Sequence, residues 1–134
     1  MIAARNRNVR VRILLPGPHI DAITVKTASK TSWGALLQTG VEIHIYQPTM
    51  LHTKLLIIDT MFVSVGSTNF DMRSLRINDE ANLNIYSNDF ATQMTAVFEN
   101  DLLASEPYSF AHWTSRPWHE KLSERVLLPI RSQL

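Results

Sequence analysis

Short segments of this chain alternate between hydrophobic and polar residues, and a period of two is typical of β-strands. Two apolar runs flank the polar pair Asp59-Thr60, so this part of the chain predicts a β-hairpin that turns near Thr60. A later segment places Ala81, Leu83 and Ile85 on one face of a predicted strand and polar residues on the other. The predicted strands cover residues 9–15, 41–46, 55–58, 61–65 and 80–86.

Apolar residues at helical spacing predict helices in the segments between these strands. Residues 21–37 form one candidate helix, which we expect to be broken at Gly34 and followed by Gly40 at a C-terminal capping position. The run Ser87-Asn88-Asp89 supplies N-cap candidates for another helix that ends near Ala104.

The length of 134 residues is enough for one compact domain with a hydrophobic core. Residues 105–134 differ from the rest, because they contain prolines, two tryptophans and a Trp118-x3-Leu122-x3-Val126 stripe at helical spacing. We therefore expect a main half-domain over residues 1–104 and a C-terminal helical tail over residues 105–134.

Charge and composition narrow the possible partners. The chain has 13 Lys and Arg against 12 Asp and Glu, a net charge of +1, which counts against a nucleic-acid partner. It has no cysteine, so it holds neither a disulfide nor a thiolate metal site. No apolar run approaches the ~20 residues that cross a bilayer, and we expect no transmembrane segment in this chain.

The predicted hairpin gathers polar side chains at its open end. His52 and Lys54 are two residues apart, so they lie on the same strand face. The hairpin turn places Gly66 and Ser67 beside them, because directly opposed positions in a hairpin have a constant sum. Asn69 follows closely. In this arrangement Lys54 and Asn69 would hold phosphate oxygens while His52 attacks phosphorus.

The spacing of these residues resembles the catalytic motif of the phospholipase D superfamily. Many fixed residue types at fixed spacings make the match specific. The matching run is His52-x-Lys54-x4-Asp59-x6-Gly66-Ser67-x-Asn69, extended by Asp71, Arg73-Ser74 and Asn78-x-Glu80-x-Asn82. Within the superfamily, the chain is most similar to the C-terminal half of bacterial cardiolipin synthases, over residues 16–21, 46–52 and 78–83.

The resemblance implies an α/β fold: a phospholipase D-like half-domain with a mixed β-sheet flanked by helices in an α-β-α sandwich. Members of the superfamily bring together two copies of the motif about a two-fold axis, and this sequence contains one. The implied partner is therefore a second motif, from an N-terminal half or from a homodimer. In the family a strand and a helix precede this point of each half-domain, so we expect the chain to be truncated at its N-terminus.

The resemblance also implies roles for single residues. His52 either attacks phosphorus to form a phosphohistidine or protonates the leaving alcohol, and Lys54 and Asn69 complete the catalytic set with Glu80, the carboxylate that orients the imidazole. Ser67 donates to phosphate or to the hairpin backbone, and the sequence leaves both open. The remaining site residues are Gly66, which binds substrate with Ser67, and the supporting residues Asp59, Asp71 and Arg73. No metal or cofactor is needed in this scheme.

The function implied is phosphatidyl transfer or phosphodiester cleavage on a phospholipid, at the cytoplasmic face of the bacterial inner membrane for the parent protein. One alternative is a single-motif phosphodiesterase or nuclease that completes its site as a homodimer. The other is an inactive, orphaned half-domain that binds phosphate or pairs with another chain. The near-neutral charge and the run from Tyr46 to His52 favour lipid over nucleic acid.

Overall fold

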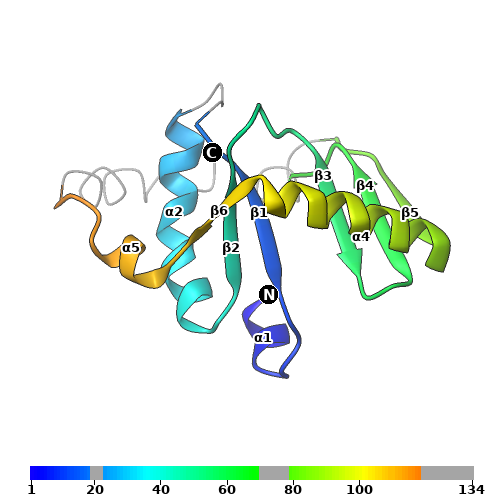
Figure 1. Ribbon diagram of the computed structural model, residues 1–134, viewed down its shortest axis with the longest axis horizontal. Coiled ribbons are helices and arrows are strands. Elements are labelled where there is room, and N and C mark those ends of the chain that lie inside the picture. The colour runs from blue at the N-terminus through cyan, green and yellow to red at the C-terminus, as the bar shows by residue number, and fades with distance from the viewer. Residues whose placement is uncertain (19–22, 70–78, 119–134) are drawn as a thin grey trace. The chain divides into compact units, whose positions relative to one another are not determined.

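The computed structural model describes residues 1–18, 23–69 and 79–118. They divide into two compact units, one made of residues 1–51 with residues 105–118 and the other lying within residues 52–104. Each unit has one three-stranded sheet and its own helices (Figure 1). The predicted α/β class with mixed strand directions is confirmed, and the strands are divided between two small sheets.

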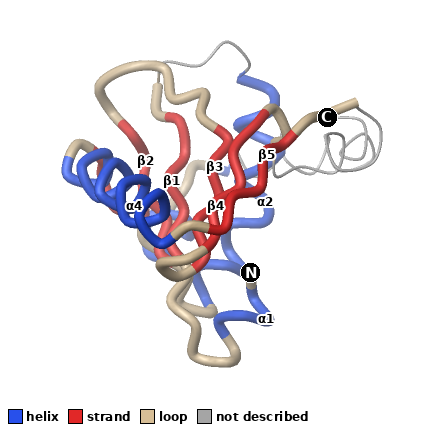
Figure 2. Tube along the Cα trace, turned by 90° about the vertical axis from the view of Figure 1, so that its right-hand side faces the viewer, coloured by secondary structure: helices blue, strands red, loops and turns tan. Residues whose placement is uncertain are grey.

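The first unit is built on a sheet with parallel and antiparallel neighbours. Strands β1 (Arg12–Pro16) and β2 (Glu42–Tyr46) are parallel and lie side by side (Figure 2). Ile13 of β1 pairs with Ile43 of β2. Strand β6 (Ser105–Tyr108) joins the other edge of β2 in the antiparallel direction and places Tyr108 opposite Ile43. The sheet order is β1 (Arg12–Pro16), β2 (Glu42–Tyr46) and β6 (Ser105–Tyr108), and the helices are α1 (Ile2–Arg5), α2 (Ile23–Gln38) and α5 (Phe110–Thr114).

The core of the first unit lies between helix α2 and this sheet. Trp33, Val41 and Ile43 are its buried centre. The Trp33 ring meets the Tyr108 ring edge to face, with centroids 5.2 Å apart, an arrangement that aromatic pairs prefer. The partly buried residues packed around this centre are Val11, Ile13, Leu15, Leu36, Leu37, Ile45, Tyr108 and Trp113.

Helix α2 runs without interruption through Gly34, so the predicted break at this residue is wrong. A Cβ atom at Gly34 would come within 2.6 Å of the Trp113 ring, whose indole N–H donates to the Lys30 carbonyl oxygen at 2.9 Å. The glycine therefore makes room for an aromatic side chain from α5. The predicted helix end is confirmed, since Gly40 has the positive φ of +84° that favours glycine after a helix.

The second unit is an antiparallel sheet with one helix packed on it. Its strands, in sheet order, are β3 (Lys54–Ile58), β4 (Phe62–Gly66) and β5 (Asn82–Tyr86). Helix α4 (Asn88–Leu103) begins at the predicted cap Ser87, whose hydroxyl oxygen accepts a hydrogen bond from the Phe90 N–H at 3.3 Å. The helix packs on β3 and β4, where Val63 and Ala91 are fully buried.

Leu83 is 63% exposed, because β5 is an outer strand of the described sheet and α4 packs on β3 and β4. One sequence-based expectation needs correction. Strand β6 lies in the segment that we expected to be a helical tail. Its short sequence, Ser105-Glu106-Pro107-Tyr108, has no apolar alternation that would identify it.

The longest helices of the described residues are α2 and α4, with 16 residues each. Over this part of the chain, no helix has both the length and the apolar character that a bilayer crossing requires.

Candidate functional site

The β3–β4 hairpin has the register that its sequence predicts, with Lys54 paired to Gly66. His52 lies two residues before β3 and is exposed, whereas Lys54 opens the strand and is half-buried. The Lys54 ammonium group donates a hydrogen bond to the His52 carbonyl oxygen at 2.9 Å. Lys54 and the backbone of His52 are therefore joined at the open end of the hairpin, beside Gly66.

Gly66 brings a third strand close to this end. It pairs with Lys54 on one side and with Asn82 on the other. A Cβ atom at Gly66 would overlap the Ala81 carbonyl oxygen and would lie 2.7 Å from the Asn82 Cα. No other residue fits without moving β5, so glycine permits close approach of the backbone at this position.

Ser67 is hydrogen-bonded to the backbone of Ala81, the residue after Glu80. Its N–H donates to the Ala81 carbonyl oxygen at 3.0 Å, and its hydroxyl oxygen accepts from the Ala81 N–H at 3.1 Å. The hydroxyl accepts in this bond and Ala81 lies outside the β3–β4 hairpin, so donation to phosphate and donation to the hairpin backbone both stay predictions. A hydroxyl that accepts one bond still has a proton to donate. Glu80, which is half-buried, is held close to Ser67 through this pairing.

Asn82 positions the loop that carries Asn69, and this role was missed from the sequence. Its side-chain oxygen accepts from the Thr68 N–H at 3.2 Å, and its amide nitrogen donates to the Ser64 hydroxyl at 3.3 Å. Ser64 is buried. The strand alternation placed Asn82 on the polar face together with Asn84, and the motif included Asn82 alone, but neither signal identified its hydrogen-bond partners.

Asp59 lies at the opposite end of the hairpin from Lys54. It has a φ of 52° in the turn between β3 and β4, a conformation that Asp tolerates better than most residues. Five residues of strand separate it from Lys54, roughly 17 Å at ~3.4 Å per residue. Asp59 thus serves the turn and does not reach a phosphorus atom beside Lys54.

The other predicted site residues differ in how far the structure describes them. Asn69 is exposed and is the last described residue after β4. Asp71 and Arg73 lie outside the described residues. The orientation of the His52 imidazole by Glu80 stays a prediction.

The described side chains at this end of the hairpin are mainly hydrogen-bond donors. They offer an ammonium group, an amide and a hydroxyl, which suit the oxygens of an anion. Within residues 1–18, 23–69 and 79–118, no three His, Cys, Asp or Glu side chains are grouped closely enough to hold a metal ion. These groups have the chemistry that binds phosphate oxygens, and a phosphate held beside the His52 imidazole stays a prediction.

Known protein families and sequences resemble this chain over most of its length. The family described as "Cardiolipin synthase, PLD-like domain" matches residues 1–102. Cardiolipin synthase A of Wigglesworthia glossinidia brevipalpis is 34% identical over 122 residues, which cover 91% of this chain and 24% of that protein. Major cardiolipin synthase ClsA of Bacillus subtilis (strain 168) is 33% identical over 125 residues, 91% of this chain and 26% of that protein. The chain spans about a quarter of the length of these curated relatives.

Two solved structures share the fold. Nuc from Salmonella typhimurium, a phospholipase D family member, matches with a TM-score of 0.71 at 21% identity. The match covers 81% of this chain and 70% of the Nuc chain. Phosphatidylserine synthase from Haemophilus influenzae Rd KW20 matches with a TM-score of 0.66 at 12% identity. The match covers 97% of this chain and 35% of the synthase chain. With the match over residues 1–102, the chain belongs to the family of cardiolipin synthase, phospholipase D-like domains.

Proposed function

We propose that this chain carries a phosphodiester-transfer site that acts on phospholipids through a phosphohistidine at His52. The observation that carries this proposal is the pairing of Lys54 with Gly66, which puts the two halves of the motif at one end of the hairpin. Family membership supports phospholipid phosphodiester chemistry. The proposal extends that chemistry to named atoms of this chain.

In the first step, the His52 imidazole nitrogen forms a bond to phosphorus, and the bond from phosphorus to the leaving alcohol oxygen breaks. That alcohol takes a proton from the histidine of a second motif. In the second step, an acceptor alcohol gives its proton to the same histidine, and its oxygen attacks phosphorus. The nitrogen–phosphorus bond then breaks and restores His52, so protons and bonds balance over the cycle.

The remaining residues lower the barrier by stabilising negative charge. Phosphate oxygens repel an incoming nucleophile, so an ammonium group and amide donors placed on them favour the transition state. Lys54 supplies the ammonium group and Asn69 the amide. Glu80 would hold the His52 imidazole in the tautomer that attacks, as a carboxylate commonly does for a catalytic histidine.

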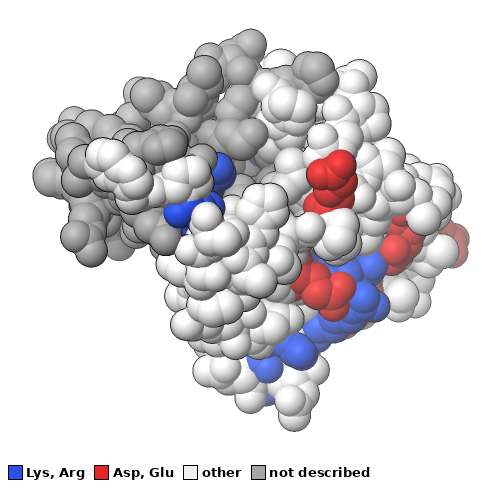
Figure 3. All heavy atoms as spheres, turned by 60° about the vertical axis from the view of Figure 1, so that its left-hand side comes forward, with Lys and Arg blue, Asp and Glu red and all other residues white. Residues whose placement is uncertain are grey.

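The site is completed by a second motif, from a homodimer or from an N-terminal half. The substrate is a phospholipid at a membrane surface, and we place the parent protein at the cytoplasmic face of the inner membrane. The net charge of +1 supports lipid over nucleic acid. On the face drawn in Figure 3, one group of Lys and Arg side chains lies beside Asp and Glu and a smaller group lies apart from it, so they form no single broad basic area.

The test is to incubate the chain with phosphatidylglycerol vesicles and ethanol, and to measure both phosphatidylethanol formation and a covalent adduct on His52 by mass spectrometry. We expect wild type and His44→Gln, a control on β2, to form both products and His52→Ala to form neither. Transfer that persists in His52→Ala, or an adduct on another residue, would contradict the proposal.

The two alternatives give different results with the same preparation. Plasmid nicking without lipid transfer would assign a nuclease and overturn the lipid substrate. A chain that is monomeric by light scattering and forms no adduct would be an inactive half-domain, because a single motif lacks the second histidine.

A further inference from the structure

The first compact unit has an open pocket of about 190 Å³ on one face of its sheet. Ile43 and Ile45 of β2 are paired with Tyr108 and Glu106 of β6, so these four side chains share this face. Helix α2 covers the part of the face at Ile43 and Tyr108 through Trp33. The other part remains accessible, since Ile45 is half-buried and Glu106 is exposed.

The floor of the pocket is aromatic and apolar. The His112 ring stacks on the Tyr108 ring, with centroids 4.7 Å apart and an interplanar angle of 23°. Tyr108 in turn meets Trp33 edge to face. Ile45 and Pro107 complete the apolar lining. Because each ring is held by the next, the His112 imidazole has a defined place beside the pocket.

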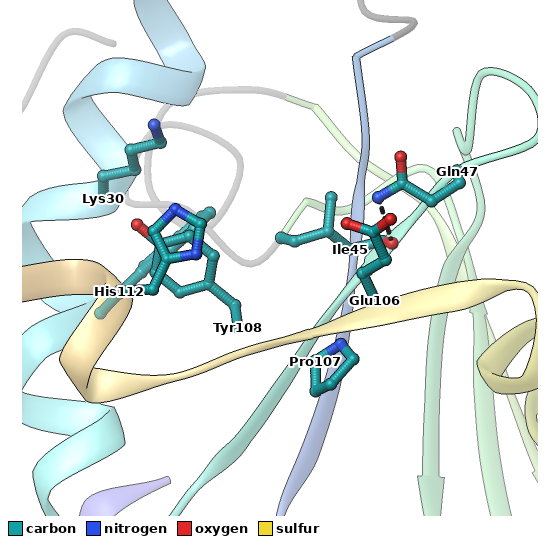
Figure 4. Close-up of a pocket in the computed structure, with 8 residues that line it drawn as sticks. Lys30, Ile45, Gln47, Glu106, Pro107, Tyr108 and His112 are labelled. Atoms are coloured by element: carbon teal, nitrogen blue, oxygen red, sulfur yellow. Dashed lines mark hydrogen bonds between the residues drawn. The ribbon is translucent and has the colours of Figure 1, made fainter. Parts of the chain in front are cut away.

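The two charged groups of the pocket, the Lys30 ammonium group and the Glu106 carboxylate, lie on different sides of its opening. Figure 4 shows Lys30 and His112 on one side of the opening and Glu106 and Gln47 on the other. The Gln47 amide donates to the Ile45 carbonyl oxygen at 3.0 Å, which holds this side chain at the pocket wall. Among the described residues, the Glu106 carboxylate makes no ion pair. A carboxylate in this position can form an ion pair with a cationic group of a ligand.

We propose that this pocket binds a small zwitterion, with its anionic group against Lys30 and His112 and its ammonium group against Glu106. Opposite charges on two sides of an apolar floor match a molecule that carries both charges. The volume holds the equivalent of about six water molecules, at ~30 Å³ each, which suits an aminoalkyl phosphate or an amino acid. The inference goes beyond the proposed phosphodiester transfer, because no lining residue lies within residues 52–104.

The experiment is a titration of the ¹⁵N-labelled chain, followed through the indole N–H signals of its tryptophans by NMR. The probes are phosphoethanolamine, inorganic phosphate and ethanolamine. We expect phosphoethanolamine to shift the Trp33 signal saturably in the millimolar range and to leave Trp118, which does not line the pocket, unchanged. The zwitterion should bind about fivefold or more tightly than phosphate or ethanolamine alone.

Three variants test the charge assignment. Glu106→Gln should reduce phosphoethanolamine affinity to that of phosphate, and Lys30→Met should weaken both. Glu99→Gln, which removes an exposed carboxylate from α4, is the matched control and should bind like wild type. Glu106→Lys, read with the same signals, should favour phosphate over the zwitterion.

The proposal is overturned if phosphoethanolamine gives no saturable Trp33 shift in the millimolar range, or if Glu106→Gln binds it like wild type. Equal affinity for phosphate and phosphoethanolamine in wild type would also overturn it, by identifying a simple anion site. None of these results bears on His52, so the proposed phosphodiester transfer is tested separately.

Discussion

The Lys54 ammonium group donates a hydrogen bond to the backbone carbonyl oxygen of His52 at 2.9 Å. This bond joins the proposed nucleophile's backbone to the proposed phosphate-binding side chain just before β3 begins. An ammonium group has three N–H donors, so one can hold the carbonyl while two remain for phosphate oxygens. Lys54 can therefore shape the chain at His52 and bind substrate at the same time.

We expect Lys54→Ala and Asn69→Ala each to lower the rate of phosphatidyl transfer by about 10² to 10³, as the loss of one preorganised donor does. Single-turnover measurements with phosphatidylglycerol vesicles give this rate directly. Lys26→Ala and Asn100→Ala are matched controls on α2 and α4 and should react at the wild-type rate. Wild-type rates in the Lys54 and Asn69 variants would remove both residues from the proposed mechanism.

Asn82→Ala should destabilise the second unit by about 0.5–1.5 kcal/mol, mainly because it leaves the buried Ser64 hydroxyl without its partner, while water can replace the exposed bond to the Thr68 N–H. Asn84→Ala is the control, since Asn84 is exposed on the same strand. Urea denaturation of both variants gives the comparison. Equal free energies of unfolding would show that the Asn82 hydrogen bonds contribute nothing net.

Gly66→Ala should also destabilise the chain, by roughly 1–3 kcal/mol, as overpacking does elsewhere. The added methyl group would overlap backbone atoms of Ala81, which cannot rotate away as a side chain can. Thr92→Ala, an exposed change on α4, should alter stability by less than about 0.5 kcal/mol. A wild-type unfolding midpoint for Gly66→Ala would mean that β5 moves aside at little cost.

The turn residue Asp59 gives a test that depends on backbone conformation alone. Its φ of 52° is costly for a β-branched residue, so Asp59→Val should lose about 1–2 kcal/mol. Asp59→Gly should stay close to wild type, since glycine adopts this conformation freely. The two variants can be compared by thermal unfolding, and equal stabilities would argue against a strained turn.

An ion pair in the first unit makes stability depend on pH. The Arg10 guanidinium donates hydrogen bonds of 2.8 and 2.9 Å to the Glu42 carboxylate and holds its pKa below the usual value of 4.5. A lowered folded-state pKa stabilises the fold above pH 4.5, and this contribution is lost as the pH falls through the folded-state value. Since the two side chains are 68% and 40% exposed, solvent keeps the contribution below about 1 kcal/mol.

We therefore expect Glu42→Gln to be slightly less stable than wild type at neutral pH, with the difference closing in acid as the pH falls below 4.5 through the lowered folded-state pKa of Glu42. Salt should reduce the difference as well. Urea denaturation at neutral pH and in acid, with and without salt, measures it. A difference that is unchanged in acid would show that packing, not charge, distinguishes the two proteins.

Local features of the fold could be predicted from the sequence, and features set by distant residues could not. The β3–β4 register follows from the polar pair Asp59-Thr60 and the apolar runs beside it, and it placed Gly66 opposite Lys54 correctly. The need for glycine at position 34 of α2 depends on Trp113, which comes from another part of the chain. No periodicity reports such a contact.

In the candidate site, too, local features could be predicted from the sequence and features set by distant residues could not. Motif spacing identified the end of the hairpin at which His52 and Lys54 lie, because strand alternation is a local rule. The role of Asn82 depends on which groups it meets on β4 and in the following loop, and its neighbour Asn84 has the same residue type and strand face. The exposure of Leu83 likewise depends on where α4 packs, which the strand pattern does not give.

The pairing of β6 with β2 has a consequence for how the chain is made. Residues 47–104 must leave the ribosome after β2 is complete and before β6 appears, and the second unit lies within this stretch. The β3–β4 hairpin can therefore form early, because its residues are close together in the sequence. One edge of β2 has no partner strand until β6 has been made. A nascent chain halted near Ala104 would expose that edge to other chains, and chaperone binding should be strongest at this length.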